Sequence, residues 1–162
     1  MDFTLEAEFD ALRLKTKAFI AEHVLPLEAD SAHYDAHENI ALPVLETVRQ
    51  KAKAAGLWAP QAPTERGGMG LPVRGWAALY EEANRSIFGP AVLNCAAPDD
   101  GNINLLSKIG TKAQKDWFLQ PLIDGAVRSS FAMTEPAPGL SLIHISEPTR
   151  QEAISYAVFC LK

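Results

Sequence analysis

Apolar side chains recur at helical spacing through most of the chain, and this period limits the possible folds more than any other feature. In the first segment they fall mostly three, four or seven positions apart, at Phe9, Leu12, Phe19, Ile20 and Val24. Side chains at this spacing share one face of an α-helix. Because Pro26 has no backbone N–H, it predicts that the helix ends just before it. The pattern therefore indicates a helix that packs through one apolar face.

Proline and glycine divide the following residues into a loop, a helix and a second loop. The polar stretch Glu28–Asn39 has no apolar face and is predicted to be a loop. A helix is expected from Leu42 to Ala55, with Pro43 in its first turn and Gly56 at its C-cap. Residues 59–72, rich in proline and glycine, predict a second loop. The apolar face of the helix would consist of Val44, Leu45, Val48 and Ala52.

Three more helices and one strand are predicted after this loop. Pro72 should begin a helix that carries Trp76, Leu79, Tyr80 and Ala83, and another helix should run from Asp99 to Ile109 and end at Gly110. Thr111 and Gln114 have the spacing of a capping box, so a helix containing Trp117, Phe118 and Leu119 should begin there and be broken by Pro121. From Val127 to Met133 the period changes to two, as in a strand. The expected fold is mainly α, with a strand at the end.

Composition excludes several classes of protein. A net charge of -5 and a pI near 5.3 provide no general attraction for nucleic acid or anionic lipid. Cys95 and Cys160 lie far apart, so neither a disulfide framework nor a cysteine-rich metal site is indicated. The acidic stretch Met1–Ala11 contains no basic residue and does not resemble a signal or transit peptide, and no apolar run is long enough to span a membrane. A cytoplasmic location is expected, or a mitochondrial or peroxisomal one if the protein is eukaryotic and its targeting segment is missing.

Two candidate reactive sites have simpler interpretations. His33 and His37 are four residues apart and could bind a metal from one face of a helix, but their segment reads as a solvated polar loop. Cys95 could be a nucleophile, but no neighbour in sequence would lower the pKa of its thiol. We therefore predict that Cys95 packs as a small apolar residue.

Two adjacent glutamates could suggest acid–base catalysis, and three tryptophans could suggest a cofactor stack, but a structural role is the simpler interpretation of both. Glu81 and Glu82 are adjacent, and adjacent residues of a helix point about 100° apart. One should lie on the surface and the other in a contact between helices. Trp58, Trp76 and Trp117 are expected to fill core or interdomain contacts rather than to stack on a cofactor.

Five short elements occur in an order that resembles the acyl-CoA dehydrogenase family, over roughly residues 3–139. They are Gly67-Gly68-Met69-Gly70-Leu71, Tyr80-Glu81-Glu82, Gly110-Thr111-Lys112-Ala113-Gln114-Lys115, Pro121-Leu122 with Gly125, and FAMTEPAPG at 131–139. The segment APDDGN at 97–102 resembles a branch in which some members carry a kinase-like domain ahead of the dehydrogenase. The resemblance implies a helical N-terminal domain at 1–126 and the start of a flavin-binding β domain at 127–139.

The same resemblance implies a function for the parent protein. Members of the family use FAD to oxidise an acyl-CoA substrate to a trans-2-enoyl-CoA, with hydride transfer to flavin N5, and pass electrons to an electron-transfer flavoprotein. They commonly form homodimers or homotetramers. The alternatives are an acyl-CoA oxidase or a flavin monooxygenase of the same fold, or a helical interaction module without enzymatic activity.

The resemblance places the flavin contacts at the end of the predicted strand. An extended backbone directs N–H and C=O groups sideways, so it can bond the rim of a flat ring. By resemblance the Thr134 hydroxyl and amide would reach the pyrimidine side of the flavin, where donors stabilise developing negative charge, and Pro136 would begin the turn toward the pyrophosphate. The predicted FAD-binding residues are Phe131, Ala132, Met133, Thr134, Glu135 and Pro136.

The sequence departs from the family pattern after Gly139. Where the family continues with small residues and a Ser-Asp pair, this chain has Leu140-Ser141-Leu142-Ile143-His144. Residues 140–162 resemble translated sequencing-adapter read-through, so we expect a non-native tail and assign it no function. The catalytic glutamate of the family is expected in a C-terminal helical domain, and no residue of this chain is nominated for that role. The printed chain is therefore expected to be inactive.

Overall fold

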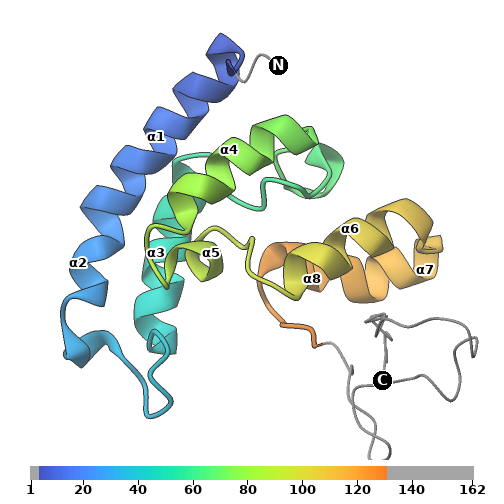
Figure 1. The fold of residues 1–162 in the computed structure, drawn as a ribbon. Helices are drawn as coiled ribbons and strands as arrows, with labels where there is room; N and C mark the ends of the chain where they lie inside the picture. The colour runs from blue at the N-terminus through green and yellow to red at the C-terminus, as the bar shows by residue number, and fades with distance from the viewer. Residues whose placement is uncertain (1–3, 131–162) are drawn as a thin grey trace, which may run out of the picture. The chain divides into compact units, whose positions relative to one another are not determined.

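Helices are the main secondary structure in the part of the chain that the structure describes. The structure is a computed structural model and describes residues 4–130. In chain order (Figure 1), the elements are α1 (Ala7–His23), α2 (Leu25–Glu28), η1 (Ser31–His33), α3 (Leu42–Ala54), η2 (Thr64–Arg66), α4 (Val73–Ala83), α5 (Gly89–Val92), α6 (Asp99–Ile109), α7 (Lys112–Gln114), the π-helical η3 (Lys115–Leu119) and α8 (Gln120–Asp124). Among residues 4–130 the only β pairing is a single bridge between Tyr34 and Ile40. The predicted mainly helical fold is confirmed.

The N-terminal part of the chain, as far as Cys95, packs around one apolar core. The long α1 lies beside α4, and α3 contacts α5 (Figure 1). These helices meet through the apolar faces that the periodicity predicts, although Val44 of α3 is only partly buried. The buried core consists of Phe19, Ile20, Val24, Ile40, Leu45, Val48, Ala52, Leu57, Leu79, Ala83, Phe88, Val92, Leu93 and Cys95.

A second apolar cluster is formed by side chains of α6, η3 and α8, which contact one another (Figure 1). Residues of the loop after α3 complete this cluster. Its buried members are Trp58, Ala59, Ala62, Ile103, Leu106, Leu119, Leu122 and Ile123. The loop between α3 and α4 thus joins the two halves of the unit that ends at Arg128.

Most helix ends occur where proline, glycine and capping residues predict them. Helix α6 has the predicted bounds, and α1 ends before Pro26, which lies in the first turn of α2. The predicted capping box is confirmed: the Gln114 amide donates to Thr111 Oγ1 at 3.3 Å, and the Thr111 amide donates to Gln114 Oε1 at 2.9 Å. These bonds satisfy two N–H groups that a helix start would otherwise leave without partners.

The prediction that Pro121 breaks the last helix is wrong. The chain widens into the π-helical η3 and then continues as α8, with Pro121 in the first turn of α8. A π turn shifts the hydrogen-bond pattern from i→i+4 to i→i+5. This change of register lets the chain pass a residue without an N–H while remaining helical. The helix ends at Gly125 instead, where φ is +77°.

The polar stretch after α2 and the predicted strand have different outcomes. Glu28–Asn39 contains the end of α2 and the short η1 but is otherwise irregular, as the loop prediction requires.

Of the predicted strand, residues 127–130 are described and are not in a strand. A strand is defined by pairing with a second segment, and no segment within residues 4–130 pairs with them. The rest of that prediction, including the start of a β domain and the tail at 140–162, lies outside the described residues.

Candidate functional site

The predicted FAD contacts lie just beyond the described part of the chain. Phe131, Ala132, Met133, Thr134, Glu135 and Pro136 are outside the described residues. The structure describes the segment that leads to these residues, Gly125–Arg128, together with the end of α8 and the N-terminus of α6. We take these three parts as the candidate functional region of the helical unit.

Buried side chains hold the last carbonyl groups of α8. Asn94 Nδ2 donates to Leu122 O at 3.0 Å and to Ile123 O at 3.2 Å, and Trp58 Nε1 donates to Ile123 O at 2.8 Å. Asn94 is 4% exposed and Trp58 is 6% exposed. Because the last carbonyls of a helix have no partner inside the helix, these bonds satisfy groups that would otherwise be buried without one.

Two cationic side chains of α3 bind the same helix end. Lys53 Nζ donates to Asp124 O at 3.0 Å, and Arg49 Nη1 donates to Gly125 O at 3.2 Å. Positive charge is favoured at a helix C-terminus, where the helix dipole is negative. We refer to Arg49, Lys53, Trp58 and Asn94 as the carbonyl clamp.

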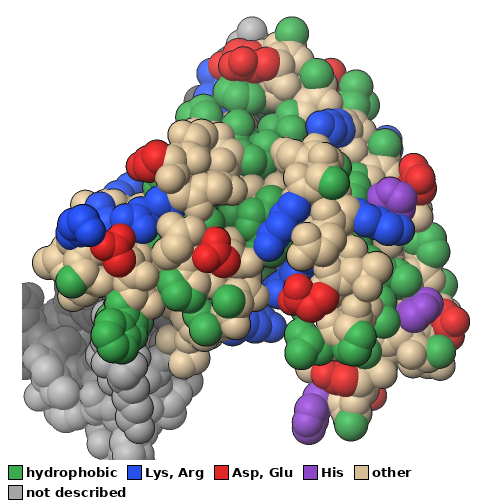
Figure 2. Space-filling view, turned by 180° about the vertical axis from the view of Figure 1, so that it is seen from behind, with side chains coloured by type: hydrophobic (Ala, Val, Ile, Leu, Met, Phe, Trp, Pro, Cys, Tyr) green, Lys and Arg blue, Asp and Glu red, His purple; other side chains and the backbone are tan. Residues whose placement is uncertain are grey.

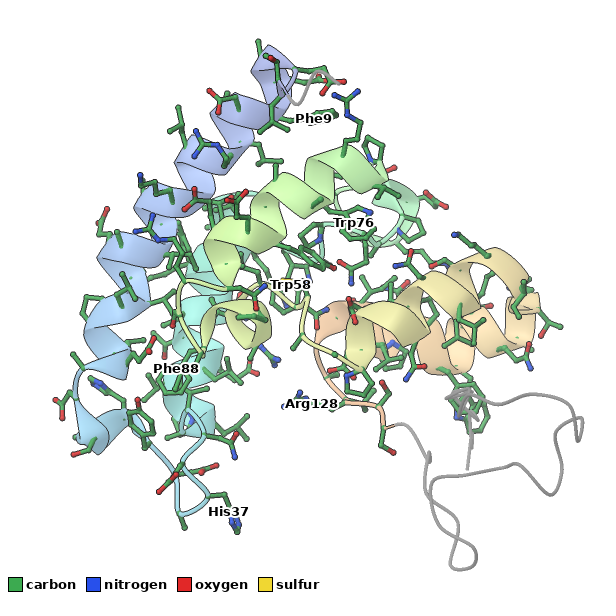
Figure 3. The ribbon with its side chains drawn as sticks, in the orientation of Figure 1. Phe9, His37, Trp58, Trp76, Phe88 and Arg128 are labelled. Carbon is green, nitrogen blue, oxygen red and sulfur yellow. The ribbon has the colours of Figure 1, made fainter. Side chains whose placement is uncertain are left out.

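The clamp side chains also support one another. Lys53 Nζ lies 4.3 Å from the centre of the Trp58 ring, and the Arg49 guanidinium lies 5.7 Å from it, both within cation–π range. Arg49 additionally donates to Ala91 O at 3.2 Å and pairs with Glu46 at 3.1 Å. The buried guanidinium is therefore bonded on several sides, as a buried charge requires. Figure 3 shows Trp58 in the interior, between the two halves of the unit.

The glycine after α8 fits against the clamp. Gly125 has φ +77°, and a Cβ at this position would lie 2.9 Å from Trp58 Cζ2. Glycine is required here both for the left-handed backbone and for the close approach of the indole ring.

A second anchor lies a few residues further on. Arg128 Nε donates to Asp99 Oδ2 at 3.3 Å, with the Asp99 side chain 5% exposed and that of Arg128 58% exposed. Asp99 is the first residue of α6 and belongs to the APDDGN segment. Arg128 (Figure 3) therefore ties the chain that leads to residue 131 back to the N-terminus of α6.

A polar group without a hydrogen-bond partner lies near the same end of α6. The Tyr80 hydroxyl is buried and has no hydrogen-bond partner among the described residues. Burial raises the pKa of Tyr80, and the charges of Cys95 and Asp100 add to the effect. Burial, opposed by a 2.7 Å bond from the Gly101 amide, also raises the pKa of Asp100, and neighbouring Asp99 contributes.

Cys95 packs as the sequence predicts. It is 4% exposed and belongs to the first core cluster. Burial, and secondarily the charge of Asp100, raises the pKa of the Cys95 thiol. Since the thiolate is the nucleophilic form, this environment opposes a nucleophilic role.

The prediction for the adjacent glutamates is confirmed. Glu81 is exposed, whereas Glu82 is 5% exposed and pairs with Arg13 of α1 at 3.0 Å and with Arg85 at 3.2 Å. Glu82 thus joins α4 to α1, and the two carboxylates do not converge.

The histidine pair lies in the irregular segment after α2. His33 Nδ1 is 3.2 Å from Leu27 O, and the His37 amide donates to Asp35 Oδ1 at 2.8 Å. The side chain of His37 points away from the fold (Figure 3). Within residues 4–130, no group of three or more His, Cys, Asp or Glu side chains is arranged to hold a metal ion.

On the face seen in Figure 2, basic side chains lie among acidic ones instead of forming one basic patch.

The tryptophans have three different environments. Trp58 is buried in the second cluster, whereas Trp76 is partly buried with its ring centre 5.0 Å from that of Tyr80. Trp117, on η3, is 77% exposed and does not fill the core of the helical unit. In η3 it is Leu119 that faces the core.

Sequence reasoning missed Arg49, Asn94 and Arg128. Arg49 lies within the predicted apolar face of α3, where an arginine breaks the pattern, and this break is the one local signal of its buried role. Asn94 adopts φ +56°, which asparagine tolerates better than most residues. Arg128 has no neighbour in sequence that predicts its contact with Asp99.

Among residues 4–130, no helix is both long and apolar enough to cross a membrane.

Comparisons with known proteins agree with the family resemblance. The profile of the acyl-CoA dehydrogenase N-terminal domain matches residues 6–126. A probable acyl-CoA dehydrogenase of Mycobacterium tuberculosis, FadE2, is 39% identical over 142 residues, covering 85% of this chain and 34% of that protein. Acyl-CoA dehydrogenase family member 11 of Gallus gallus is 41% identical over 129 residues, covering 76% of this chain and 16% of that protein.

A solved structure has the same fold. The structure of a putative acyl-CoA dehydrogenase from Mycobacterium abscessus matches with a TM-score of 0.74 and 36% sequence identity, over 83% of this chain and 36% of that one. This chain therefore spans about a third of the length of these two bacterial relatives. The profile match, the sequence identity and the shared helical fold lead to one conclusion: the chain belongs to the acyl-CoA dehydrogenase family.

Proposed function

We propose that the protein from which this chain comes is an FAD-dependent acyl-CoA dehydrogenase that oxidises an acyl-CoA to a trans-2-enoyl-CoA. The observation that carries the proposal is the family match over residues 6–126, followed after residues 127–130 by the sequence FAMTEPAPG at 131–139. The acyl-CoA dehydrogenase names of the relatives support the same reaction class.

The described residues would serve the site by holding the chain that approaches it. The carbonyl clamp fixes the end of α8, and Arg128 is held by Asp99. This arrangement suits a flavin-binding strand, which must keep its backbone groups in register with a flat ring. FAD, when bound, would supply the acceptor for the hydride that leaves the substrate.

Within the proposed site, the residues at 131–136 would bind and orient FAD. The Thr134 hydroxyl and the backbone amides are neutral donors, which suits a ring edge that gains negative charge. The catalytic glutamate of the family is expected in the C-terminal helical domain, outside the matched region. We therefore expect the printed chain alone to lack dehydrogenase activity.

The partners follow from the same proposal. The electron acceptor would be an electron-transfer flavoprotein, and the full-length protein would form a homodimer or homotetramer. A cytoplasmic location is proposed, or a mitochondrial or peroxisomal one if a targeting segment precedes this chain.

The test uses the purified full-length protein. We expect visible flavin absorbance that bleaches when an acyl-CoA is added without oxygen, and steady reduction of an electron-transfer flavoprotein. The matched variant is Thr134→Val, which keeps the side-chain shape but removes the hydroxyl and should weaken FAD binding about tenfold. A colourless protein that takes up no FAD would reject the proposal. Rapid reoxidation of the reduced flavin by oxygen would instead assign an oxidase or a monooxygenase.

A further inference from the structure

The end of α8 is held by more side chains than a helix cap requires. Many helices end with one glycine and backbone bonds alone, and α8 has both, with the Gly125 amide bonded to Leu122 O at 3.1 Å and the Ala126 amide bonded to Pro121 O at 3.0 Å. The carbonyl clamp adds side-chain donors from three places: α3, the loop after it and the link between α5 and α6. Its arginine is buried, which costs solvation energy that a solvent-exposed cap would not lose.

The two anchors leave the intervening chain little freedom. Gly125 O accepts from Arg49, the Trp58 ring leaves no room for a Cβ at Gly125, and Arg128 donates to Asp99. Extended chain reaches at most about 3.5 Å per residue, so the segment between these anchors can take few paths. Residue 131, the first proposed FAD contact, follows soon after the second anchor.

We infer that Arg49, Trp58 and Asn94 are positioning residues for the flavin-binding segment: by holding the α8 carbonyls, they set the place and direction in which the chain leaves the helical unit. The inference rests on the proposed function. It differs from a purely stabilising role, because it requires that loosening the clamp changes flavin binding more than an equal loss of stability elsewhere does.

The test compares clamp variants with a matched variant in the full-length protein. Arg49→Met keeps an unbranched apolar stem but removes the donors and the charge. Asn94→Gly keeps access to positive φ but removes the side-chain amide. Arg49→Lys keeps the charge and one donor group. The matched control is Arg13→Met, which removes another arginine that bridges two helices but lies outside the clamp. The variants are compared by thermal unfolding.

Three measurements report on positioning. They are the FAD dissociation constant of the apoprotein, the midpoint potential of the bound flavin, and the rate at which trypsin cleaves after Arg128, identified by mass spectrometry. We expect Arg49→Met and Asn94→Gly to weaken FAD binding and to speed the cleavage, each at least about tenfold, because each variant removes more than one side-chain hydrogen bond. They should also shift the potential, and Arg49→Lys should lie between wild type and Arg49→Met.

The outcomes separate this inference from the proposed function. A colourless wild-type protein rejects the proposed function. Clamp variants that lose stability like Arg13→Met, with unchanged FAD affinity, potential and cleavage rate, overturn the inference. Trypsin cleavage does not need flavin. An unchanged rate of cleavage after Arg128 in the clamp variants therefore overturns the inference whether or not the wild-type protein binds FAD.

Discussion

The two adjacent glycines of the Gly-Gly-Met-Gly loop should respond differently to alanine, because the structure requires glycine at each for a different reason. Gly67 has φ +94°, and a Cβ there would meet nothing within 4 Å. Gly68 has no such backbone requirement, but its Cβ would overlap Ala62 O and lie 2.5 Å from Ala62 Cβ. We therefore expect Gly67→Ala to cost backbone strain alone and Gly68→Ala to cost packing.

The magnitudes follow from these distances. A left-handed alanine costs about 1 kcal/mol of folding free energy, which is the expected loss for Gly67→Ala. In Gly68→Ala the methyl group would have to move Ala62 by about 1 Å to reach ordinary contact distance. Ala62 O also accepts the Gly70 amide at 2.7 Å, so the shift would strain that bond as well. Overpacking together with a weakened hydrogen bond should cost about 2–4 kcal/mol.

The assay is urea unfolding of the 162-residue chain followed by far-ultraviolet circular dichroism. Asparagine provides the matched comparison, because it tolerates positive φ but is larger than alanine. Gly67→Asn should be less destabilising than Gly67→Ala, whereas Gly68→Asn should be at least as destabilising as Gly68→Ala. The reasoning is refuted if Gly68→Ala costs no more than Gly67→Ala, or if asparagine and alanine have equal effects at position 67.

Three further predictions concern stability and use the same unfolding assay. Thr111→Ala removes the capping-box acceptor and should cost about 1 kcal/mol, whereas an unchanged urea midpoint would contradict a role for the cap. Ile103→Ala empties a fully buried site and should cost about 2–5 kcal/mol, against at most about 0.5 kcal/mol for Ile109→Ala, which alters a side chain 73% exposed. The pKa of Asp35 is lowered, first by the backbone N–H of Asn39 and then by that of His37. Its stabilising effect is therefore present above its ordinary value of 3.8 and lost as the pH falls below it. Asp35→Asn should reduce the fall in urea midpoint between about pH 5 and pH 2, and an unchanged pH profile would contradict this assignment.

Local signals were enough to predict most of the helices. Helix α6 begins and ends as predicted, and the Thr111–Gln114 capping box is present. Each of these features depends on residues within about one turn of one another, so the chain around them carries the information. The separate roles of Glu81 and Glu82 were predictable for the same reason, because helix geometry alone turns neighbouring side chains apart.

The error at Pro121 shows where a local rule fails. Proline lacks an N–H wherever it occurs, and the rule treats that loss as the end of a helix. Here the π-helical η3 shifts the bonding register ahead of Pro121, while Leu119, Leu122 and Ile123 pack in the second cluster and keep this segment helical. Packing at a distance thus overrode a local preference.

By itself, the sequence determined the helical period, the family and the residues proposed to bind FAD, because these depend on residue type and on spacing along the chain. Only the tertiary structure decided that Arg49 and Asn94 would hold the end of α8 and that Arg128 would pair with Asp99. These partners are separated by tens of residues, and a carbonyl at a helix end accepts any donor that folding brings to it. Their pairing therefore depends on how α3, α6 and α8 pack, which no short stretch of sequence specifies.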